Sequence, residues 1–369
     1  MDLAKAEFLA EKLVGKQVGG WVIRKLKDHG KSAAVFLAEN DAGTAAVKIF
    51  DDELIERFGD KVQLARIDRE LTLVGKHHPN MVRIFGGGFD DITRNHYIVM
   101  EYLDGPDLKE CLQDVPSDQI GILISQLASC AEYLEGLGLC HRDIKPENII
   151  VVEEFKRLIL LDFGVLRPMG QPGLTDDGGI QPFIGTLQYS SPEFLLRQEK
   201  DEVEGWRALS FYQIGAVLHD LIMRKELFQE FSQPYAKLVN AVQNINPTIQ
   251  NSAVDPNLVE LARACLLKNP QNRLRLLDWS SFHPRKDGES GLSAKQRVTN
   301  RAILAQAESS APAQQTIVGY AECVNDTIDF LKNATHLVRQ DNDMFPPLAI
   351  ATRVKNCDQF KIRIRWSAS

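Results

Sequence analysis

The residues best suited to chemistry lie in one stretch of the chain, between positions 141 and 164. The run HRDIKPEN occupies 141–148, and the tripeptide DFG follows at 162–164. Asn148 and Asp162 supply hard oxygen atoms of the kind that Mg²⁺ prefers as ligands. Asp143 adds a carboxylate that can accept a hydrogen bond from a hydroxyl group. These residue types suit the transfer of a phosphoryl group to a hydroxyl oxygen.

The two motifs together closely resemble the catalytic loop and the metal-binding motif of protein kinases. Asp162 lies 14 residues after Asn148, and two short apolar runs between them predict a hairpin. The resemblance implies ATP and Mg²⁺ as cofactors, with Mn²⁺ as an alternative metal, and it assigns the metal to Asn148 and Asp162. It also implies that Asp143 orients the attacking hydroxyl and that Lys145 steadies the γ-phosphate. Phosphoryl transfer has a loose transition state, so the protein mainly supplies alignment and positive charge.

A lysine in an apolar strand is a further catalytic candidate. AAVK at 45–48 resembles the kinase strand whose lysine contacts the α- and β-phosphates. Lys48 lies among apolar residues, where a charged amine is costly without a partner. Glu70, 22 residues later on an expected helix, is the best candidate for an ion pair with Lys48. Glu53 and Glu56 are less favoured because they lie nearer to the start of that helix.

The loop that covers the phosphates in this family has the poorest match. Where the family pattern is GxGxxGxV, this chain has DHGKSAAV at 28–35, so only Gly30 agrees. Asp28 and Ala33 stand at the outer glycine positions, which makes close backbone approach to a phosphate harder. The resemblance assigns Val35 and Ala46 to one side of the adenine and Ile150 to the other. It assigns the hinge to Met100, Glu101, Tyr102 and Leu103.

Two later motifs fit the same family. GTLQYSSPE at 185–193 resembles the end of an activation segment, and KNPQNRL at 268–274 resembles a helix turn whose arginine pairs with that segment's glutamate. The resemblance therefore predicts an ion pair between Glu193 and Arg273. It also places Ser210 where the family has an aspartate that anchors the catalytic loop, so we expect a weaker, neutral anchor there.

The acceptor and its regulation are suggested by residues around these motifs. Lys145 together with Thr186 is the combination found in Ser/Thr kinases, and it favours Ser or Thr acceptors. Arg142 suggests a pocket that a phosphorylated residue of the activation segment could neutralise. Thr175 is the first candidate for that phosphate, with an ordinary unmodified loop threonine as the alternative. Thr186 is the second regulatory candidate, although we expect it to hydrogen-bond Asp143 and Lys145 instead.

Periodicity places these motifs on two differently built lobes. Alternating apolar positions predict strands early in the chain, and helical periods dominate later. We therefore predict an α+β, bilobal protein kinase fold, with a five-stranded antiparallel N-lobe carrying one helix at about 20–101 and a mainly helical C-lobe at about 105–285. The expected elements are three strands in 20–50, further strands at 81–88, 97–101, 149–152 and 158–161, and helices in 51–76, 118–137, 207–224 and 254–267.

The kinase-like region, residues 20–285, is expected to have three neighbours: an N-terminal extension at 1–19, a linker at 286–315 and a small C-terminal α+β module of unrecognised family at 316–369. The module is predicted to hold an amphipathic helix at 317–331 and two strands, LAIATRV and FKIRIRW. Alternation puts Lys361, Arg363 and Arg365 on one face of the last strand. That face is either the solvated side of a half-buried strand or a docking surface for an acidic substrate or segment. Residues 286–369 are thus candidates for partner binding or autoregulation.

Composition limits the partners. The chain has 369 residues, of which 44% are hydrophobic and 25% charged, as in ordinary globular proteins. A formal net charge of −7 disfavours nucleic acid and anionic membranes, which are themselves negative, and leaves protein substrates as the better fit. The six cysteines include no CxxC pair, which predicts buried, reduced thiols. No apolar run reaches the roughly 18 residues of a membrane span, so we expect a soluble, cytoplasmic protein.

Two other functions are compatible with the sequence. A pseudokinase scaffold, which binds nucleotide without transferring phosphate, is suggested by the degraded glycine loop and by Ser210. A kinase of small molecules shares the fold and a similar catalytic loop. The complete activation segment, which would have no evident use in a small-molecule kinase, argues against the second alternative.

Overall fold

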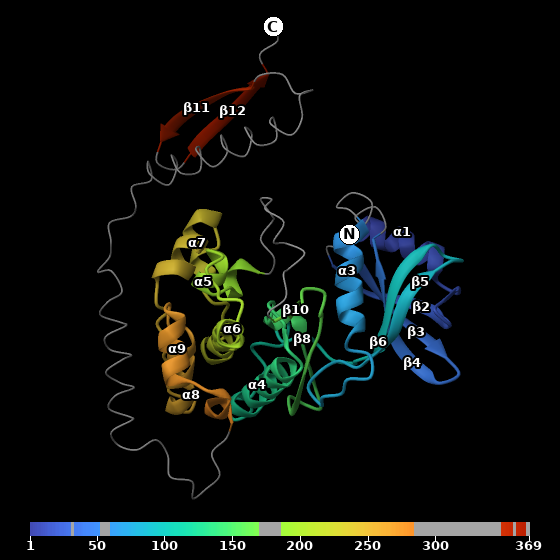
Figure 1. The fold of residues 1–369 in the computed structure, drawn as a ribbon, viewed down its shortest axis with the longest axis horizontal. Helices are drawn as coiled ribbons and strands as arrows, with labels where there is room; N and C mark the ends of the chain where they lie inside the picture. Colours follow the sequence, from blue (N-terminus) through green and yellow to red (C-terminus); the bar gives the residue numbers. More distant parts are fainter. Residues whose placement is uncertain (31–32, 52–59, 170–185, 284–347, 357–358, 367–369) are drawn as a thin grey trace, which may run out of the picture. The chain divides into compact units, whose positions relative to one another are not determined.

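The computed structural model describes residues 1–30, 33–51, 60–169 and 186–283, together with two C-terminal strands; residues 60–63 and these two strands are described by their backbone (Figure 1). The chain divides into two compact units, Met1–Glu308 and Ser309–Ser369. All the chemistry-bearing motifs belong to the first unit.

The N-terminal lobe of the first unit is built on one antiparallel sheet of six strands, in the order β1-β2-β3-β4-β6-β5. The five longer strands confirm the predicted sheet. The first strand, β1, was not predicted from the sequence; it is only two residues long and pairs with the start of β2. The strands are β1 Gln17–Val18, β2 Trp21–His29, β3 Ala33–Asn40, β4 Gly43–Phe50, β5 Ile84–Asp90 and β6 Asn95–Glu101.

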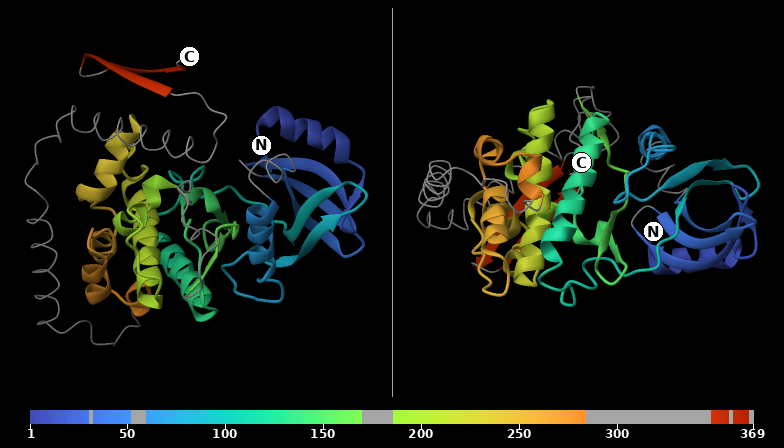
Figure 2. Two further views of the ribbon diagram at one scale, coloured as in Figure 1. Left: turned by 45° about the horizontal axis from the view of Figure 1, so that its top comes forward. Right: turned by 90° about the horizontal axis from the view of Figure 1, so that it is seen from below.

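One face of this sheet is closed by a helix that the sequence analysis did not predict. Side chains alternate across a strand, and in β3 and β4 this places Phe36, Val47 and Ile49 on one fully buried face. Helix α1, Leu3–Leu13, packs Leu9 and Leu13 into the same cluster (Figure 2). The segment expected to be an N-terminal extension therefore contributes α1 and β1 to the lobe.

The opposite face of the sheet carries the candidate nucleotide residues. Val35 lies across from Lys48, and Ala46 lies between Leu37 and Met100, so these residues share one face. Helix α3, Asp60–Leu71, lies on that side and contributes Ile67 to the main core. It is shorter than the predicted 51–76; residues 52–59, which include Glu53 and Glu56, lie outside the described part.

The C-terminal lobe is a helical layer around α6, Val203–Met223. Sixteen of its 21 residues are buried, so α6 is a core helix without a solvent face. Local chemistry sets the starts of α8 and α9, where Asp255 and Asn269 cap the helix and a proline follows each cap. The other helices are α4 Ile120–Gly136, α5 Pro192–Leu195, α7 Tyr235–Asn244, α8 Pro256–Cys265 and α9 Pro270–Leu276.

Short strands complete this lobe and hold the catalytic motifs. The predicted hairpin is present as β8, Ile149–Val152, and β9, Arg157–Leu160, with Ile149 opposite Leu160. The two-residue strands β7, Leu139–Cys140, and β10, Arg167–Pro168, pair just outside the two motifs. Both motifs are thus fixed at their flanks by backbone pairing.

The second unit is described as one antiparallel hairpin of β11, Leu348–Asn356, and β12, Gln359–Trp366. Both predicted closing strands are therefore present, with Ile350 opposite Ile364. The helix predicted at 317–331 lies outside the described residues. Among the helices that the structure does describe, none has the length and apolar content needed to cross a membrane.

Candidate active site

Asp143 is held on both carboxylate oxygens by three donors. Its Oδ1 accepts a hydrogen bond from the Thr186 backbone N–H at 3.0 Å. Its Oδ2 lies 3.0 Å from the Lys145 ammonium and 3.2 Å from the Asn148 side-chain amide nitrogen. Asn148 also donates to the Asp143 carbonyl oxygen at 2.8 Å. The carboxylate is therefore fixed in one orientation, as a group that must aim a hydroxyl requires.

Thr186 makes the contacts expected from the sequence. Lys145 donates from Nζ to the Thr186 hydroxyl at 2.7 Å, while the Thr186 backbone contacts Asp143. The predicted link between the activation segment and the catalytic loop is confirmed. Thr175, the other regulatory candidate, lies outside the described residues.

Lys48 is the centre of a second charged cluster. Its Nζ lies 2.9 Å from Glu70 Oε1 and 2.8 Å from Asp162 Oδ1, so the predicted Lys48–Glu70 pair is confirmed and a second carboxylate is added. Burial opposes the charge on Lys48, but attraction by Asp162 and Glu70 outweighs it and raises the Lys48 pKa. The same attraction by Lys48 lowers the pKa of Asp162 to about 2. Burial raises the pKa of Glu70, and attraction by Lys48 opposes that rise. Lys48 and Asp162 are therefore charged at neutral pH.

Asn148 and Asp162 fit the role of metal ligands. Asn148 uses its amide nitrogen on Asp143, and Asp162 uses Oδ1 on Lys48, which leaves the Asn148 Oδ1 and the Asp162 Oδ2 as the candidate metal ligands. The Asp162 side chain is 51% exposed. These two hard oxygens are of the type that Mg²⁺ or Mn²⁺ takes.

His141 connects the two motifs. Its Nδ1 accepts a hydrogen bond from the Asp143 backbone at 3.3 Å, so Nε2 carries the proton and donates to the Leu161 carbonyl at 2.9 Å. Burial lowers the pKa of His141, which keeps the ring neutral in this bridging role.

The backbone of Asp162 has φ 56°, a left-handed conformation uncommon outside glycine and often seen at functional sites.

The adenine-binding candidates line the half-buried side of the sheet and the hairpin. Val35, Met100 and Ile150 are partly exposed, and Ala46 is 7% exposed. Among the hinge candidates, Glu101 ends β6, while Tyr102 and Leu103 follow it, and all three are partly exposed. In the glycine loop, Gly30 donates its N–H to the Ala33 carbonyl at 2.8 Å. Residues 31 and 32 lie outside the description.

The expected role of Ser210 is wrong. Its hydroxyl donates to the Trp206 carbonyl, 3.1 Å away in the same helix, and lies near Cys140 instead of bonding the catalytic loop. Gln213 anchors that loop instead, donating to the Arg142 carbonyl at 2.9 Å and accepting from the Ile144 N–H at 3.4 Å. Gln213 is three residues after Ser210 and so lies on the same side of the helix, with a longer side chain that reaches the loop.

Replacing Gln213 by Ala is expected to lower phosphoryl transfer by roughly 10- to 100-fold, because the backbone on both sides of Asp143 loses its support. Two buried backbone groups are left without partners, so stability should fall by about 1–3 kcal/mol. Ser210→Ala is the matched control in the same helix and should change the rate less than about threefold. Rates and urea unfolding of both variants decide the matter. An equal loss of rate in the two variants would mean that Ser210 also anchors the catalytic loop.

The predicted Glu193–Arg273 ion pair is present and buried, with side chains 7% and 0% exposed. Arg273 also donates to three carbonyl groups, those of Ala208, Leu267 and Lys268. The end of the activation segment is thereby tied to the core of the helical lobe.

Arg142 lies in a cluster of guanidinium groups. Its Nε donates to the Val165 carbonyl at 2.7 Å. Burial, reinforced by the neighbouring charges of Arg167 and Arg69, lowers the pKa of Arg142 to about 10. Concentrated positive charge of this kind favours a phosphate group nearby.

Comparisons with known proteins point the same way. The family model described as protein kinase domain matches residues 26–281. PkaA, a serine/threonine-protein kinase of Streptomyces coelicolor, is 28% identical over 278 residues, which are 73% of this chain and 48% of that protein. A probable serine/threonine-protein kinase PknB of Bifidobacterium longum is 30% identical over 57% of this chain and 31% of its own length. CBL-interacting serine/threonine-protein kinase 18 of Arabidopsis thaliana is 32% identical over 50% of this chain and 35% of its own length. The chain thus spans about a third to a half of these relatives.

Proposed function

This chain belongs to the protein kinase domain family, and we propose on that premise that it transfers the γ-phosphate of ATP to Ser and Thr hydroxyls of proteins, itself included. Members of the family generally use ATP and a divalent metal. The observation that carries the proposal is the fixed carboxylate of Asp143, bonded through Lys145 and Thr186 to the activation segment. The relatives named as serine/threonine-protein kinases support the same acceptor class.

In this proposal each charged residue has a separate task. Asp143 accepts a hydrogen bond from the acceptor hydroxyl and aims its oxygen at the γ-phosphorus. Lys145 lies beside that hydroxyl and balances charge on the moving phosphoryl group, and Lys48, oriented by Glu70, contacts the α- and β-phosphates. Asn148 and Asp162 would hold Mg²⁺, which would supply positive charge to the phosphate groups.

The two alternatives lose support from particular contacts. Ser210 was one of two reasons to consider a scaffold without catalysis, and Gln213 now supplies the anchor that Ser210 lacks. A small-molecule kinase would not need the platform formed by 187–193, where Tyr189 donates to Asp220 at 2.6 Å and Glu193 pairs with Arg273.

The proposal also covers regulation and cellular location. Phosphate on Thr175 would be attracted by the Arg142 cluster, and residues 286–369 would bind a partner or regulate the kinase domain. A cytoplasmic location is proposed because the four cysteines that the structure describes are buried, free thiols, as expected in a reducing compartment.

Incubation of the full chain with Mg–ATP tests the function, with intact mass and phosphopeptide mapping as readouts. We expect phosphate on Ser or Thr, Thr175 among them, and none when EDTA removes the metal. Lys48→Ala serves as the background control, because a contaminating kinase would still phosphorylate it. Measurable Mg–ATP binding with no phosphate on the chain or on a generic acceptor would instead identify a scaffold.

A further inference from the structure

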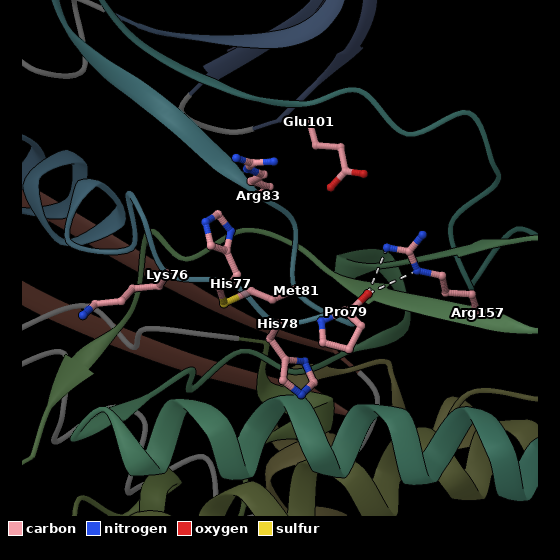
Figure 3. Close-up of a pocket in the computed structure, with 8 residues that line it drawn as sticks. All are labelled: Lys76, His77, His78, Pro79, Met81, Arg83, Glu101 and Arg157. Carbon is pink, nitrogen blue, oxygen red and sulfur yellow. Dashed lines mark hydrogen bonds between the residues drawn. The ribbon is translucent and has the colours of Figure 1, made fainter.

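A cavity of about 330 Å³ lies away from the charged clusters of the candidate active site, behind the predicted hinge (Figure 3). Its walls come from the segment between α3 and β5, from the end of β6 and from the start of β9. Lys76, His77, Arg83 and Arg157 provide basic groups, and Glu101 provides one carboxylate. With the histidines neutral, three cations and one anion leave the cavity a net charge of +2. This is opposite to the −7 of the whole chain.

Two of the three cations are available to a ligand. Among the residues that the structure describes, neither Lys76 nor Arg83 forms an ion pair, and both are exposed. The Arg83 guanidinium lies over the Phe85 ring, 5.5 Å from its centroid, which limits its mobility without neutralising its charge. Because three cations and only one carboxylate line the cavity, an anion there would be favoured.

The third cation is held in place by the protein. Arg157 donates from Nε and Nη2 to the Pro79 carbonyl at 3.2 and 3.1 Å, and its Nη1 lies 3.4 Å from the exposed Glu153 carboxylate (Figure 3). These bonds anchor the guanidinium at the edge of the cavity before any ligand arrives. A preformed cationic group lowers the entropy cost of binding.

His78 builds the wall and is not a ligand for the cavity. Its Nδ1 accepts from the Asn80 N–H at 3.2 Å, its Nε2 donates to Ser129 at 3.2 Å, and its ring stacks on Tyr133. Burial lowers the pKa of His78, which agrees with a neutral ring in this role. The buried Met81 gives the cavity an apolar floor.

We propose that this cavity binds a phosphate monoester, carried either by a phosphorylated side chain of another protein or by a small metabolite. The net charge of +2 matches a phosphate monoester, which carries about −1.5 to −2 at neutral pH. Arg83 offers the forked N–H groups that bind phosphate oxygens in pairs, Lys76 adds a point charge, and Arg157, whose Nε and Nη2 are bonded to Pro79, adds a fixed positive charge at the edge. The site is separate from the phosphate positions of the proposed kinase reaction and does not depend on that function.

Calorimetric titration of the full chain tests the site, with Mg²⁺ and a non-hydrolysable ATP analogue present in excess to fill the nucleotide cleft. The probes are a phosphoserine peptide, glycerol 3-phosphate and inorganic phosphate. Lys76→Gln and Arg83→Gln should each weaken binding by about three- to tenfold, and the double variant should remove it. Glu101→Gln should strengthen binding by about threefold, because it removes the opposing charge.

Lys237→Gln, an exposed lysine on α7, is the control and should leave binding unchanged. Both pocket variants should keep the wild-type melting temperature, since neither side chain makes an ion pair among the described residues. Tighter binding of the phosphoserine peptide than of the small phosphates would show that the ligand is a phosphorylated protein. Tighter binding of the small phosphates would show that it is a metabolite. Absence of binding, or binding that the double variant retains, as expected for phosphate at the Arg142 cluster, would overturn the proposal.

Discussion

Asp143→Asn is expected to reduce phosphoryl transfer by roughly 10²- to 10⁴-fold while Mg–ATP still binds. All three groups that contact the Asp143 carboxylate are donors, namely the Thr186 N–H, the Lys145 ammonium and the Asn148 amide. An asparagine must turn its own N–H₂ towards one of these donors, so it loses a hydrogen bond as well as the charge that aims the hydroxyl. Stability should fall by about 1–3 kcal/mol because this position is buried. Single-turnover phosphorylation, nucleotide titration and urea unfolding measure the three effects.

Thr186→Val gives the matched comparison for Asp143→Asn. It keeps the backbone N–H that contacts Asp143 but removes the hydroxyl that accepts from Lys145. We expect a loss of only about tenfold, because Asp143 remains charged and oriented. A loss in Thr186→Val as large as in Asp143→Asn would mean that the threonine hydroxyl, and not the carboxylate, limits the reaction.

The local motifs were predictable because short-range geometry places their side chains. Ile149 pairs with Leu160 in the hairpin, so Asn148 and Asp162 must emerge at the same end of it. The spacing of 14 residues and the hairpin between them were therefore enough to predict that the two candidate metal ligands lie close together. The Lys48–Glu70 pair was predictable for a different reason: a lysine on an apolar strand needs a carboxylate, and the resemblance to the kinase pattern singled out Glu70.

Contacts that depend on the packing of distant elements were not predictable in the same way. Asp162 also reaches Lys48, although 114 residues separate them. Gln213 lies in a helix that is buried almost all round, so periodicity could not show which polar residue of α6 faces the catalytic loop. The serine at 210 in place of the family's aspartate could be seen in the sequence. That Gln213, one turn later, anchors the catalytic loop instead could be seen only in the three-dimensional structure.

The anionic-ligand cavity illustrates the same limit. Lys76 and Arg83 lie in the segment between α3 and β5, and Arg157 lies at the start of β9; in the sequence each looks like an ordinary surface residue. They line one cavity in the folded chain, where Arg157 donates to the Pro79 carbonyl of the other segment. The number and order of charged residues along the sequence do not show that these three cations line one cavity.

Arg273→Met is expected to lower the free energy of unfolding by about 3–5 kcal/mol, the largest stability effect among the variants considered for this chain. The change leaves the Glu193 carboxylate buried without its cation. It also removes the donor from the carbonyl groups of Ala208, Leu267 and Lys268. The activation-segment end should loosen, so phosphorylation of protein acceptors should fall at temperatures where the variant is still folded. Urea unfolding at pH 7 gives the free energy, and an activity assay below the transition gives the second effect.

Arg24→Met is the control for Arg273→Met, because Arg24 pairs with Glu39 on the surface, with side chains 50% and 43% exposed. Water already solvates those two charges, so the loss should stay below about 1 kcal/mol. The double variant Glu193→Gln with Arg273→Met should be less unstable than the sum of the two single variants, since it leaves no buried charge unpaired. Equal costs for Arg24→Met and Arg273→Met would mean that burial does not strengthen the Glu193–Arg273 pair, and that the activation segment is held by its apolar contacts alone.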